Sequence, residues 1–417
     1  MLPERIPLLE VSIGETLRAG QLLKTSNYEF RYLDPNPEQA SVALLMPARQ
    51  RPSWQAGDLF PAMDQNLPEG DLFMKIRAMF PRQPTTPMHL LALMGRNGIG
   101  RLGYAVPDTV PAGLPRPLSK AELLAMNYTP QVFDELVRAY LNTGAGIAGM
   151  QPKIMVPERL TVPVPSLIVK AASGAYPGLA ANEYLCLKAA RSAGIVTPSF
   201  ELSNDGQMLL LDRFDVVEHG DGRIERLGFE DIAALAGLRV RDVLSDRKYQ
   251  GSYQRIAELL QQLQLPSENL HRFFEQVAFS VMVRNGDAHL KNFGLLYRSS
   301  TDVWLAPLFD VVTTAIYRYT QYQGGPELED RSLALKLFAG RHKTKAYPTT
   351  EELHTFGRKV CAVARPEPVV ARIAEAMQTT LAGAKGDERV PPGLLRDMHE
   401  VWERGMAHAR CGRRQQS

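Results

Sequence analysis

The chain has 417 residues, of which 45% are hydrophobic and 22% are charged, and this predicts two or three structural units with sizeable cores. The formal net charge of +3 is too small to indicate nucleic-acid binding without a local basic patch. Three scattered cysteines without CxxC spacing argue against a zinc site or a disulfide framework and favour a cytoplasmic protein. Because the sequence shows neither a secretory signal nor an apolar run of roughly eighteen residues, we expect no membrane contact.

Residues 1–106 are predicted to form a small α+β subdomain. Short alternating segments indicate strands, and two later segments have the periodicity of helices. The strand candidates are NYEFRYL at 27–33 and SVALLMPA at 41–48, and the helix candidates are DLFMKIRAMF at 71–80 and MHLLALMG at 88–95. Residues 107–120 are rich in proline, which predicts an extended linker before the next domain.

Residues 121–215 are predicted to form a lobe that combines strands with a few helices. Thr129 followed by Pro130 makes a good cap and first turn for a helix. Further along, the dipeptide Asp205–Gly206 separates two apolar runs, which is a strong hairpin signal.

Helical periodicity dominates residues 216–417. The expected fold class is therefore α+β: a small N-terminal subdomain, followed by a small sheet-containing lobe at 121–215 and a mainly helical lobe at 216–417. The last two lobes have the layout of a bilobal protein kinase, although layout alone does not define an activity.

The segment RNGDAHLKNF at 284–293 concentrates residues that phosphoryl transfer requires. This chemistry needs a carboxylate to orient the attacking hydroxyl, and amide and carboxylate oxygens to hold Mg²⁺ on the phosphates. Protein kinases place four residues between the catalytic-loop aspartate and a metal-binding asparagine, and Asp287 and Asn292 have this spacing. Asp310 follows the hairpin candidates FGLLY and VWLAPLF, where such enzymes carry a second metal-binding aspartate.

Each of these residues also has a purely structural explanation. Asp287 could cap a turn, His289 could be a satisfied structural histidine, and Asp310 could end a strand. Three spacings and an order of elements would then have to coincide by chance, so we favour the kinase interpretation.

Two upstream features supply groups for nucleotide phosphates. Lys170 ends the apolar run SLIVK, where burial is costly unless the ammonium meets phosphate or carboxylate. Glu183 on the following helix is its natural partner, as in kinases, and a surface lysine at a strand end is the alternative. The glycine-rich segment 141–153 could bring backbone amides to phosphates, although a flexible turn explains such a segment more simply when it is taken alone.

The segment GIGRLG at 98–103 matches the GxGxxG pattern of dinucleotide-binding sites. It leads into YAVP, which is strand-like and ends in proline, whereas in a dinucleotide site the glycines open a helix. We therefore reject a Rossmann-type site at this position.

The order of these motifs resembles the HipA-like toxin kinases of bacterial type II toxin–antitoxin systems. The resemblance rests on AGMQPK (148–153), IVK (168–170), NEYLCLKAARSAGI (182–195), LDRFD (211–215), GDAHLKNFGLL (286–296), APLFDVVTT (306–314) and LALKLFAG (333–340). It extends into the N-terminal subdomain through IGETL, LPEGDLF and LLALMGRNGIGRLGYAV. Nearly the whole chain is therefore covered.

The resemblance implies a serine/threonine kinase that uses ATP and Mg²⁺. Carried over position by position, Asp287 would be the catalytic base, His289 and Lys291 would support the catalytic loop, and Asn292 and Asp310 would bind the metal. The residues implied at the ATP site are Gly146, Ala148, Gly149, Lys153, Lys170, Glu183, Asp212, Phe214 and Asp215. Within this set, Asp212 and Phe214 would meet adenine through the backbone, and Asp215 would lie at the nucleoside edge.

The resemblance also implies partners. Family targets include a component of translation, notably glutamyl-tRNA synthetase, with growth arrest and persistence as the outcome. The usual antitoxin is a HipB-like helix-turn-helix dimer, which would join the kinase to operator DNA.

One position departs from the family pattern. Members that are regulated by autophosphorylation carry a serine just before IAG, and this chain has Gly146 there, with Thr143 as the nearest hydroxyl. A phosphate on that loop would add charge able to hold it away from the ATP site. We therefore expect that this protein does not silence itself at residue 146.

Two other functions are compatible with the same residues. The first is a small-molecule kinase of the aminoglycoside or choline type, which shares the spacing from Asp287 to Asn292. The second is a nucleotide-binding scaffold that complexes an antitoxin and acts as a corepressor. Retention of the full set of predicted catalytic and metal-binding residues argues against an inactive scaffold.

Overall fold

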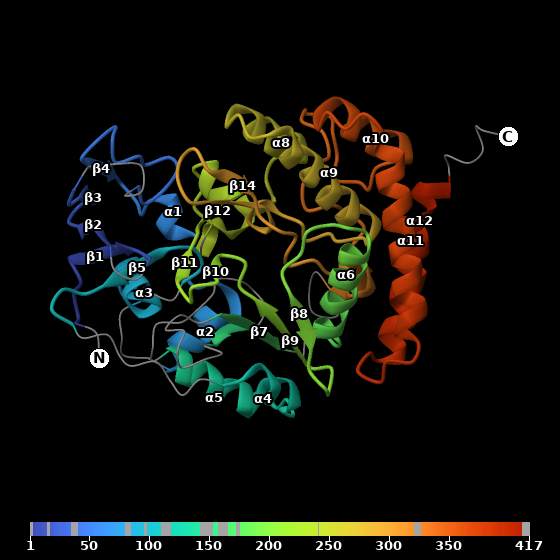
Figure 1. The fold of residues 1–417 in the computed structure, drawn as a ribbon, viewed down its shortest axis with the longest axis horizontal. Coiled ribbons are helices and arrows are strands. Elements are labelled where there is room, and N and C mark those ends of the chain that lie inside the picture. Colours follow the sequence, from blue (N-terminus) through green and yellow to red (C-terminus); the bar gives the residue numbers. More distant parts are fainter. Residues whose placement is uncertain are drawn as a thin grey trace. The chain divides into compact units, whose positions relative to one another are not determined.

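The structure is a computed structural model that describes residues 3–14, 17–34, 41–79, 85–95, 98–109, 118–141, 153–156, 166–171, 176–240, 242–320 and 327–410. The chain divides into two compact units that interleave along the sequence. The first unit comprises Met1–Ala171, Leu210–Arg247 and Gly294–Val303, and the second comprises Ala172–Leu209, Lys248–Phe293 and Trp304–Ser417. Each unit contains both helices and strands (Figure 1), which confirms the α+β fold class. The domain boundaries expected from the sequence stay predictions.

The first unit begins with a five-stranded antiparallel sheet in the order β4-β3-β2-β1-β5. Its strands are β1 (Leu8–Ile13), β2 (Leu17–Lys24), β3 (Tyr28–Tyr32), β4 (Ser53–Ala56) and β5 (Leu102–Ala105). Along β3 the side chains of Tyr28, Phe30 and Tyr32 are buried and their neighbours are not, so the strand predicted at NYEFRYL is confirmed. Helices α1 (Pro61–Asp64), α2 (Gly70–Met79) and α3 (Pro87–Met94) follow in the chain, and α2 and α3 confirm the two helix predictions.

The strand expected at SVALLMPA is wrong. Residues 41–48 instead form successive turns around the hydroxyl group of Tyr32, which accepts a 3.0 Å hydrogen bond from the Val42 amide and donates to the carbonyl of Met46. The buried tyrosine satisfies backbone groups that a strand would have paired with a neighbour, and Val42 and Met46 are buried around it. A local alternation of apolar residues could not reveal this long-range partner.

The rejected GxGxxG segment has a structural role in the first unit. Its residues run directly into β5 and open no helix, and its backbone contacts buried charged side chains. The amide of Gly100 donates a 2.7 Å hydrogen bond to Asp215, while the carbonyl of Gly98 accepts 3.0 Å hydrogen bonds from Arg213 and Arg226. Gly100 has a φ of +79°, a value that favours glycine.

The later elements of the first unit include α4 (Lys120–Ala125), α5 (Pro130–Leu141), the antiparallel pair β6 (Lys153–Val156) and β7 (Leu167–Ala171), β10 (Val216–Glu218), β11 (Ile224–Arg226), β12 (Gly228–Asp231), α7 (Ile232–Leu235) and β13 (Gly294–Tyr297). The predicted cap of α5 is confirmed, because the Thr129 hydroxyl accepts a 3.1 Å hydrogen bond from the Val132 amide. Strand β9 (Met208–Asp212) lies beside β7, and β12 pairs with β13.

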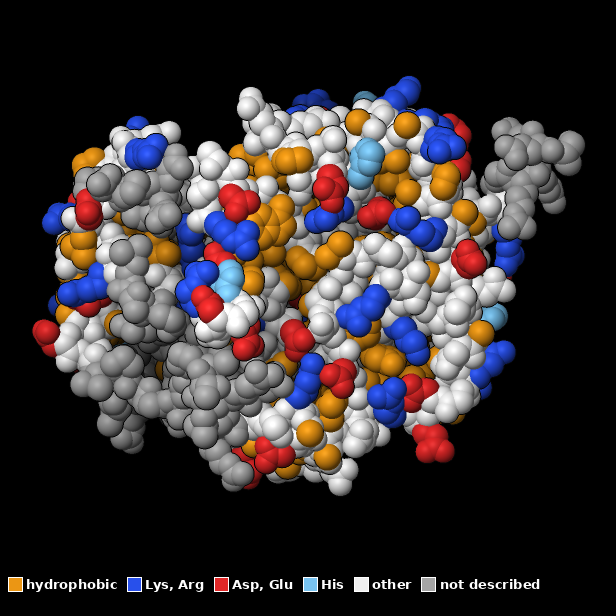
Figure 2. All heavy atoms as spheres, viewed as in Figure 1, with side chains coloured by type: hydrophobic (Ala, Val, Ile, Leu, Met, Phe, Trp, Pro, Cys, Tyr) orange, Lys and Arg blue, Asp and Glu red, His pale blue; other side chains and the backbone are white. Residues whose placement is uncertain are grey.

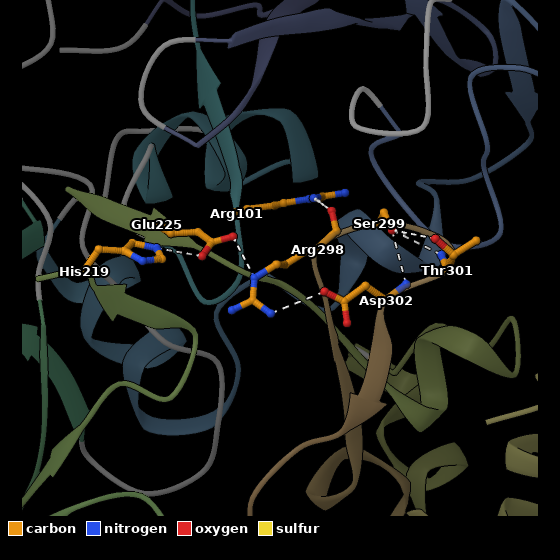
Figure 3. Close-up of polar contacts among 7 residues, drawn as sticks. All are labelled: Arg101, His219, Glu225, Arg298, Ser299, Thr301 and Asp302. Carbon is orange, nitrogen blue, oxygen red and sulfur yellow. Dashed lines mark hydrogen bonds and ion pairs between the residues drawn. The ribbon is translucent and has the colours of Figure 1, made fainter. Parts of the chain in front are cut away.

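A network of charged side chains joins the β10–β11 hairpin to the turn that follows β13 (Figure 3). Arg298 donates to Glu225 at 3.0 Å and to Asp302 at 3.3 Å, and Nε2 of His219 lies 3.0 Å from the other oxygen of Glu225. Arg101 donates a 2.7 Å hydrogen bond to the carbonyl of Arg298. Because most of these groups are partly exposed, the ion pairs orient the hairpin and contribute little stability each.

The second unit is mainly helical. Its helices are α6 (Leu179–Ser192), α8 (Tyr253–Gln262), α9 (Ser267–Met282), α10 (Thr350–Thr355), α11 (Pro366–Ala384) and α12 (Pro392–Arg410). Helix α11 packs against α6 and α12, and α9 packs against α8, α11 and α12. Phe273, Phe274, Phe279 and Trp402 are fully buried in this core.

The second unit also contains β8 (Phe200–Leu202), whose turn into β9 confirms the predicted hairpin. The Ser203 amide donates a 2.8 Å hydrogen bond to the Met208 carbonyl, and Gly206 has a φ of +72°. The remaining strands are β14 (Val303–Leu305), β15 (Arg318–Thr320) and β16 (Glu327–Glu329).

Among the helices in the described ranges, none is both long and apolar enough to cross a bilayer. Figure 2 shows acidic and basic side chains interspersed over the visible face, as expected from a nearly balanced charge.

Candidate active site

The predicted catalytic loop follows α9 in the second unit, and its backbone is held by local hydrogen bonds. Arg284 has a φ of +57°, which turns the chain out of the helix. The buried Asn285 donates its amide to the Ser280 carbonyl at 2.9 Å, and its side-chain oxygen accepts a 3.0 Å hydrogen bond from the Asp287 amide. The next turn is fixed by Tyr253, whose hydroxyl donates to the Ala288 carbonyl at 2.9 Å. The loop therefore presents Asp287 in a defined position.

The groups around Asp287 have opposing effects on its pKa. Tyr249, at the end of the 3-10 helix Asp242–Tyr249, donates a 2.7 Å hydrogen bond to Oδ1 of Asp287. Although 44% of the Asp287 side chain is open to solvent, the enclosing protein atoms raise its pKa by desolvation. The Tyr249 hydrogen bond and the nearby Lys248 lower this pKa, and the charges of Asp310 and Asp330 raise it.

His289 is a buried neutral side chain and not the partner of an ion pair. Its Nε2 lies 3.9 Å from Oδ1 of Asp287. Burial, followed by the charges of Lys248 and Lys291, lowers the pKa of His289 well below its usual value. The ring stacks edge-on against Tyr249, with centroids 5.1 Å apart, and its Nδ1 has no hydrogen-bond partner among the described residues. We infer that the ring fixes the shape of the loop.

Asn292 and Asp310 lie together, and their donor atoms suit a magnesium ion. Asn292 Nδ2 donates a 3.2 Å hydrogen bond to the Asp310 carbonyl, which leaves Oδ1 of Asn292 buried and without a hydrogen-bond partner in the described part of the chain. Amide and carboxylate side-chain oxygens are both donors that Mg²⁺ accepts. Since the charges of Asp310 and Asp330 both raise the pKa of Asp287, a cation here would be stabilised electrostatically.

Protein carboxylates, imidazoles and thiols alone do not complete a metal site. Across the described ranges, His, Cys, Asp and Glu side chains form no group of three or more that could hold a metal ion. A magnesium ion at Asn292 and Asp310 would therefore need further oxygen ligands, which is how this ion is usually bound beside nucleotide phosphates.

Lys170 and Glu183 are both buried, which excludes the alternative of a surface lysine at a strand end. Lys170 lies in β7 of the first unit with 3% of its surface exposed, and Glu183 lies in α6 of the second unit with none exposed. Burial of such charges is costly unless each meets a counter-charge or a hydrogen-bonding group. Their pairing with each other stays a prediction.

The three residues predicted at the nucleoside have different surroundings in the first unit. Asp212 accepts a 3.1 Å hydrogen bond from Lys120, and the Phe214 ring lies 5.7 Å from that of Phe229. Asp215 is fully buried, where it binds Arg213 through both carboxylate oxygens in addition to the Gly100 amide. These contacts give Asp215 a structural role, and its place at the nucleoside edge stays a prediction.

Part of the predicted ATP site lies outside the described residues. This holds for Gly146, Ala148 and Gly149, and for the side chain of Lys153, whose backbone pairs with that of Lys170 in β6 and β7. Lys291 lies in the 3-10 helix Leu290–Asn292 and is half-buried, where its charge contributes to the lowered pKa of His289.

Several residues around the site were not anticipated from the sequence, chiefly Lys248, Tyr249, Asn285 and Tyr253. Tyr249 lies 38 positions before Asp287 in a segment without a distinctive pattern. Only Asn285 carried a local signal, because an asparagine two residues before an aspartate commonly accepts a hydrogen bond within a turn.

The mainly helical second unit carries Asp287, Asn292 and Asp310, and the first unit carries the buried Lys170 in a strand. These features are those of a kinase-like α+β protein. The chain matches the model of the HipA-like C-terminal domain over residues 145–384 and that of the HipA N-terminal domain over residues 9–105. It therefore belongs to the HipA family.

Similar proteins agree with this assignment. A chain of the Shewanella oneidensis MR-1 toxin–antitoxin complex of HipA, HipB and operator DNA is similar in fold, with a TM-score of 0.67, 16% identity and 96% of each chain covered. Among curated proteins, "Putative kinase Y4dM" of Sinorhizobium fredii is 30% identical over 38% of this chain and 41% of its own. "Putative kinase Y4mE" of the same organism is 26% identical over 52% of this chain and 50% of its own. The chain thus spans about half the length of these curated relatives.

Proposed function

We propose that this protein is a serine/threonine protein kinase that uses ATP and Mg²⁺ and acts as the toxin of a type II toxin–antitoxin system. The observation that carries the proposal is the constellation in the second unit: a carboxylate held by Tyr249, with the unpartnered oxygen of Asn292 beside Asp310. An aspartate that only caps a turn would not require Asn292 and Asp310 nearby. Phosphoryl transfer requires the base and both metal-binding residues.

In this proposal each side chain has a defined task. Asp287 accepts the proton of the attacking serine or threonine hydroxyl, through the oxygen that Tyr249 does not bind. Asn292 and Asp310 hold the metal ion, which when bound would neutralise charge on the ATP phosphates. The neutral ring of His289 and the ammonium of Lys291 support the loop.

In the proposal, the nucleotide is bound by residues of the first unit and by Glu183 of α6. Lys170 binds the phosphates and Glu183 orients it, in keeping with the burial of both side chains. The glycine-rich loop with Gly146, Ala148 and Gly149, together with Lys153, covers the phosphates, and Asp212, Phe214 and Asp215 border the nucleoside.

The proposed partners follow from the family. The HipA neighbour described above was solved with HipB and operator DNA, which supports a HipB-like antitoxin for this chain. Contact with operator DNA would then be made through the antitoxin. The substrate is a cytoplasmic protein of translation, with glutamyl-tRNA synthetase as the first candidate, and its phosphorylation causes growth arrest and persistence.

A measurement of ATP turnover separates the proposal from its rivals. We expect that the purified chain with Mg²⁺ hydrolyses or transfers the γ-phosphate faster when bacterial protein extract is added, and that aminoglycosides and choline have no effect. Stimulation by a small alcohol alone would identify a small-molecule kinase. Tight ATP binding without turnover under any condition would favour the scaffold function, which co-purification with a helix-turn-helix protein would then support.

A further inference from the structure

The segment that carries Asp310 is held by a buried side chain of α6. Thr313, three residues after Asp310, is fully buried. The side-chain oxygen of Asn182 accepts a 2.9 Å hydrogen bond from the Thr313 amide, and the side-chain nitrogen donates to the Thr313 carbonyl at 3.1 Å. Asn182 thereby satisfies both backbone groups of Thr313, as a paired strand would. It is itself fully buried and precedes Glu183 in the same helix.

A second contact reaches Thr313 from the C-terminal helix α12. The indole Nε1 of Trp402 donates a 2.7 Å hydrogen bond to the Thr313 hydroxyl, and both side chains are fully buried. A buried indole N–H normally finds a partner, because leaving it unpaired costs free energy. Two helices that are far apart in sequence therefore converge on one residue of the Asp310 segment.

Helix α12 can hold Thr313 in a fixed position because α12 itself packs very closely against α9. A Cβ atom added to Gly405 would lie 1.7 Å from the Met282 carbonyl oxygen, so only glycine permits this approach. Met282 is the last residue of α9, the helix that leads into the catalytic loop. The helix that holds Thr313 is thus fixed to the helix that presents Asp287.

The backbone at Asp310 also benefits from support. Asp310 has a φ of +51°, in the left-handed region that residues other than glycine seldom adopt, although aspartate and asparagine do so more often than most. Such a conformation persists when surrounding contacts determine it. Asn292 binds the Asp310 carbonyl on one side, and the next residue after Thr313 completes the support: the Thr314 hydroxyl accepts a 2.7 Å hydrogen bond from the Gly286 amide.

We propose that Asn182 and Trp402 are positioning residues, which hold residues 310–314 so that Asp310 and Asn292 can bind the metal ion together. This inference rests on the proposed function for the metal-binding role of Asp310. It extends the active machinery to α12, which lies beyond the part of the chain matched by the HipA-like C-terminal domain. Neither side chain touches the nucleotide or the metal in this proposal.

The test compares Trp402→Phe with Trp54→Phe in the full chain. Both changes remove an indole N–H and keep an aromatic ring, but Nε1 of Trp54 is buried without a hydrogen-bond partner among the described residues, so its loss should be silent. The first measurement is hydrogen exchange of the amides at 310–316, which needs no activity. The second is the ratio of the dissociation constants of a non-hydrolysable ATP analogue without and with Mg²⁺.

We expect Trp402→Phe to accelerate exchange at 310–316 and to reduce the Mg²⁺-dependent gain in analogue affinity about three- to tenfold, which is roughly the worth of one neutral hydrogen bond. Thr313→Val removes the same hydrogen bond from the other side, together with the 3.5 Å contact between the Thr313 hydroxyl and Sγ of Cys186. The double variant Trp402→Phe with Thr313→Val should then lose little more than Thr313→Val alone, because the bond to Trp402 is already absent in it. Trp54→Phe should match the parent in both measurements.

Unchanged exchange and unchanged magnesium dependence in Trp402→Phe would overturn the inference. Faster exchange with a full magnesium gain would also overturn it, since α12 would then stabilise the segment without serving the metal. If the parent chain itself shows no magnesium gain, the proposed function fails, and the exchange measurement still decides whether Trp402 holds the segment.

Discussion

The hydroxyl of Tyr249 donates a 2.7 Å hydrogen bond to Oδ1 of Asp287, although the two residues lie 38 positions apart in the chain. The contact fixes one oxygen of the proposed base and leaves the other for a substrate hydroxyl. Because the Tyr249 ring also stacks on His289, one side chain contacts two residues of the proposed catalytic loop, and its hydrogen bond lowers the pKa of Asp287.

Tyr249→Phe should lower kcat/KM about ten- to a hundredfold, roughly the worth of one hydrogen bond to a charged group. Burial raises the pKa of Asp287 and the Tyr249 hydrogen bond lowers it, so the variant should have a higher pKa at this position. The base works deprotonated, and activity is lost as pH falls through its pKa. The acid limb of the pH profile should therefore move to higher pH.

Tyr347→Phe is the matched control for this change. The Tyr347 hydroxyl is buried without a hydrogen-bond partner among the described residues, so its removal should leave the profile in place. Equal shifts in the two variants would refute a specific role for Tyr249.

Gly286→Ala should disable the catalytic loop. An added Cβ atom would lie 1.9 Å from a carboxylate oxygen of Asp330 and 2.8 Å from the carbonyl oxygen of Ser332. Relief of this clash requires movement of backbone next to Asp287, and we expect a loss of about 1–3 kcal/mol in the free energy of unfolding together with most of the activity. Urea denaturation and phosphotransfer assays measure the two effects.

Gly383→Ala serves as the comparison for that variant. Gly383 is the last residue but one of α11, and a Cβ atom there meets nothing within 4 Å. Replacement of glycine by alanine at such a helix end should leave the stability unchanged or raise it by up to about 0.5 kcal/mol. If both glycine variants behaved alike, the close approach to Asp330 would have no consequence.

The free energy of unfolding should decrease as the pH falls from neutral to mildly acidic, partly because of His408. Burial, with the charges of Arg284 and His354 nearby, lowers the pKa of this α12 side chain to about 4. Between its unfolded pKa near 6.5 and this value, the unfolded chain binds a proton that the folded chain does not, so stability decreases as pH falls. From pH 7 to pH 5 the contribution is about 2 kcal/mol.

Substitution of His408 by glutamine should remove that part of the pH dependence. Urea unfolding at pH 7 and pH 5 measures this change in the free energy of unfolding. The parent is the reference, because the contributions of His289 and His354 are present in both proteins and cancel in the comparison. An identical loss of stability in the parent and the variant would show that His408 is not responsible.

Incubation with ATP should leave residues 141–153 without a stoichiometric phosphate. The serine by which relatives are silenced is replaced by Gly146, and the expectation rests on sequence alone because the loop lies outside the described residues. Intact-mass analysis followed by peptide mapping provides the measurement. A full phosphate on Thr143 would reveal a substitute switch.

The parts of the site that could be predicted from the sequence are those with short-range spacing. Asp287 and Asn292 lie five positions apart in one loop, so their spacing alone predicts a shared task, whereas Tyr249 and Trp402 make their contacts through tertiary packing. The same distinction explains the fold. Helix α5 follows from its local cap at Thr129, but the turns at 41–48 depend on the distant hydroxyl of Tyr32.

The most direct test of the account is transfer of labelled γ-phosphate from ATP and Mg²⁺ into a bacterial lysate, with the parent compared with Asp287→Asn. The variant keeps an oxygen that can accept from Tyr249 but cannot take a proton from the substrate hydroxyl. Asp397→Asn, an exposed change on α12, controls for the loss of a charge. We predict that the parent and the control label one discrete protein and that Asp287→Asn does not. Equal labelling by all three proteins would contradict the role of Asp287, and no labelling by any would contradict the kinase function.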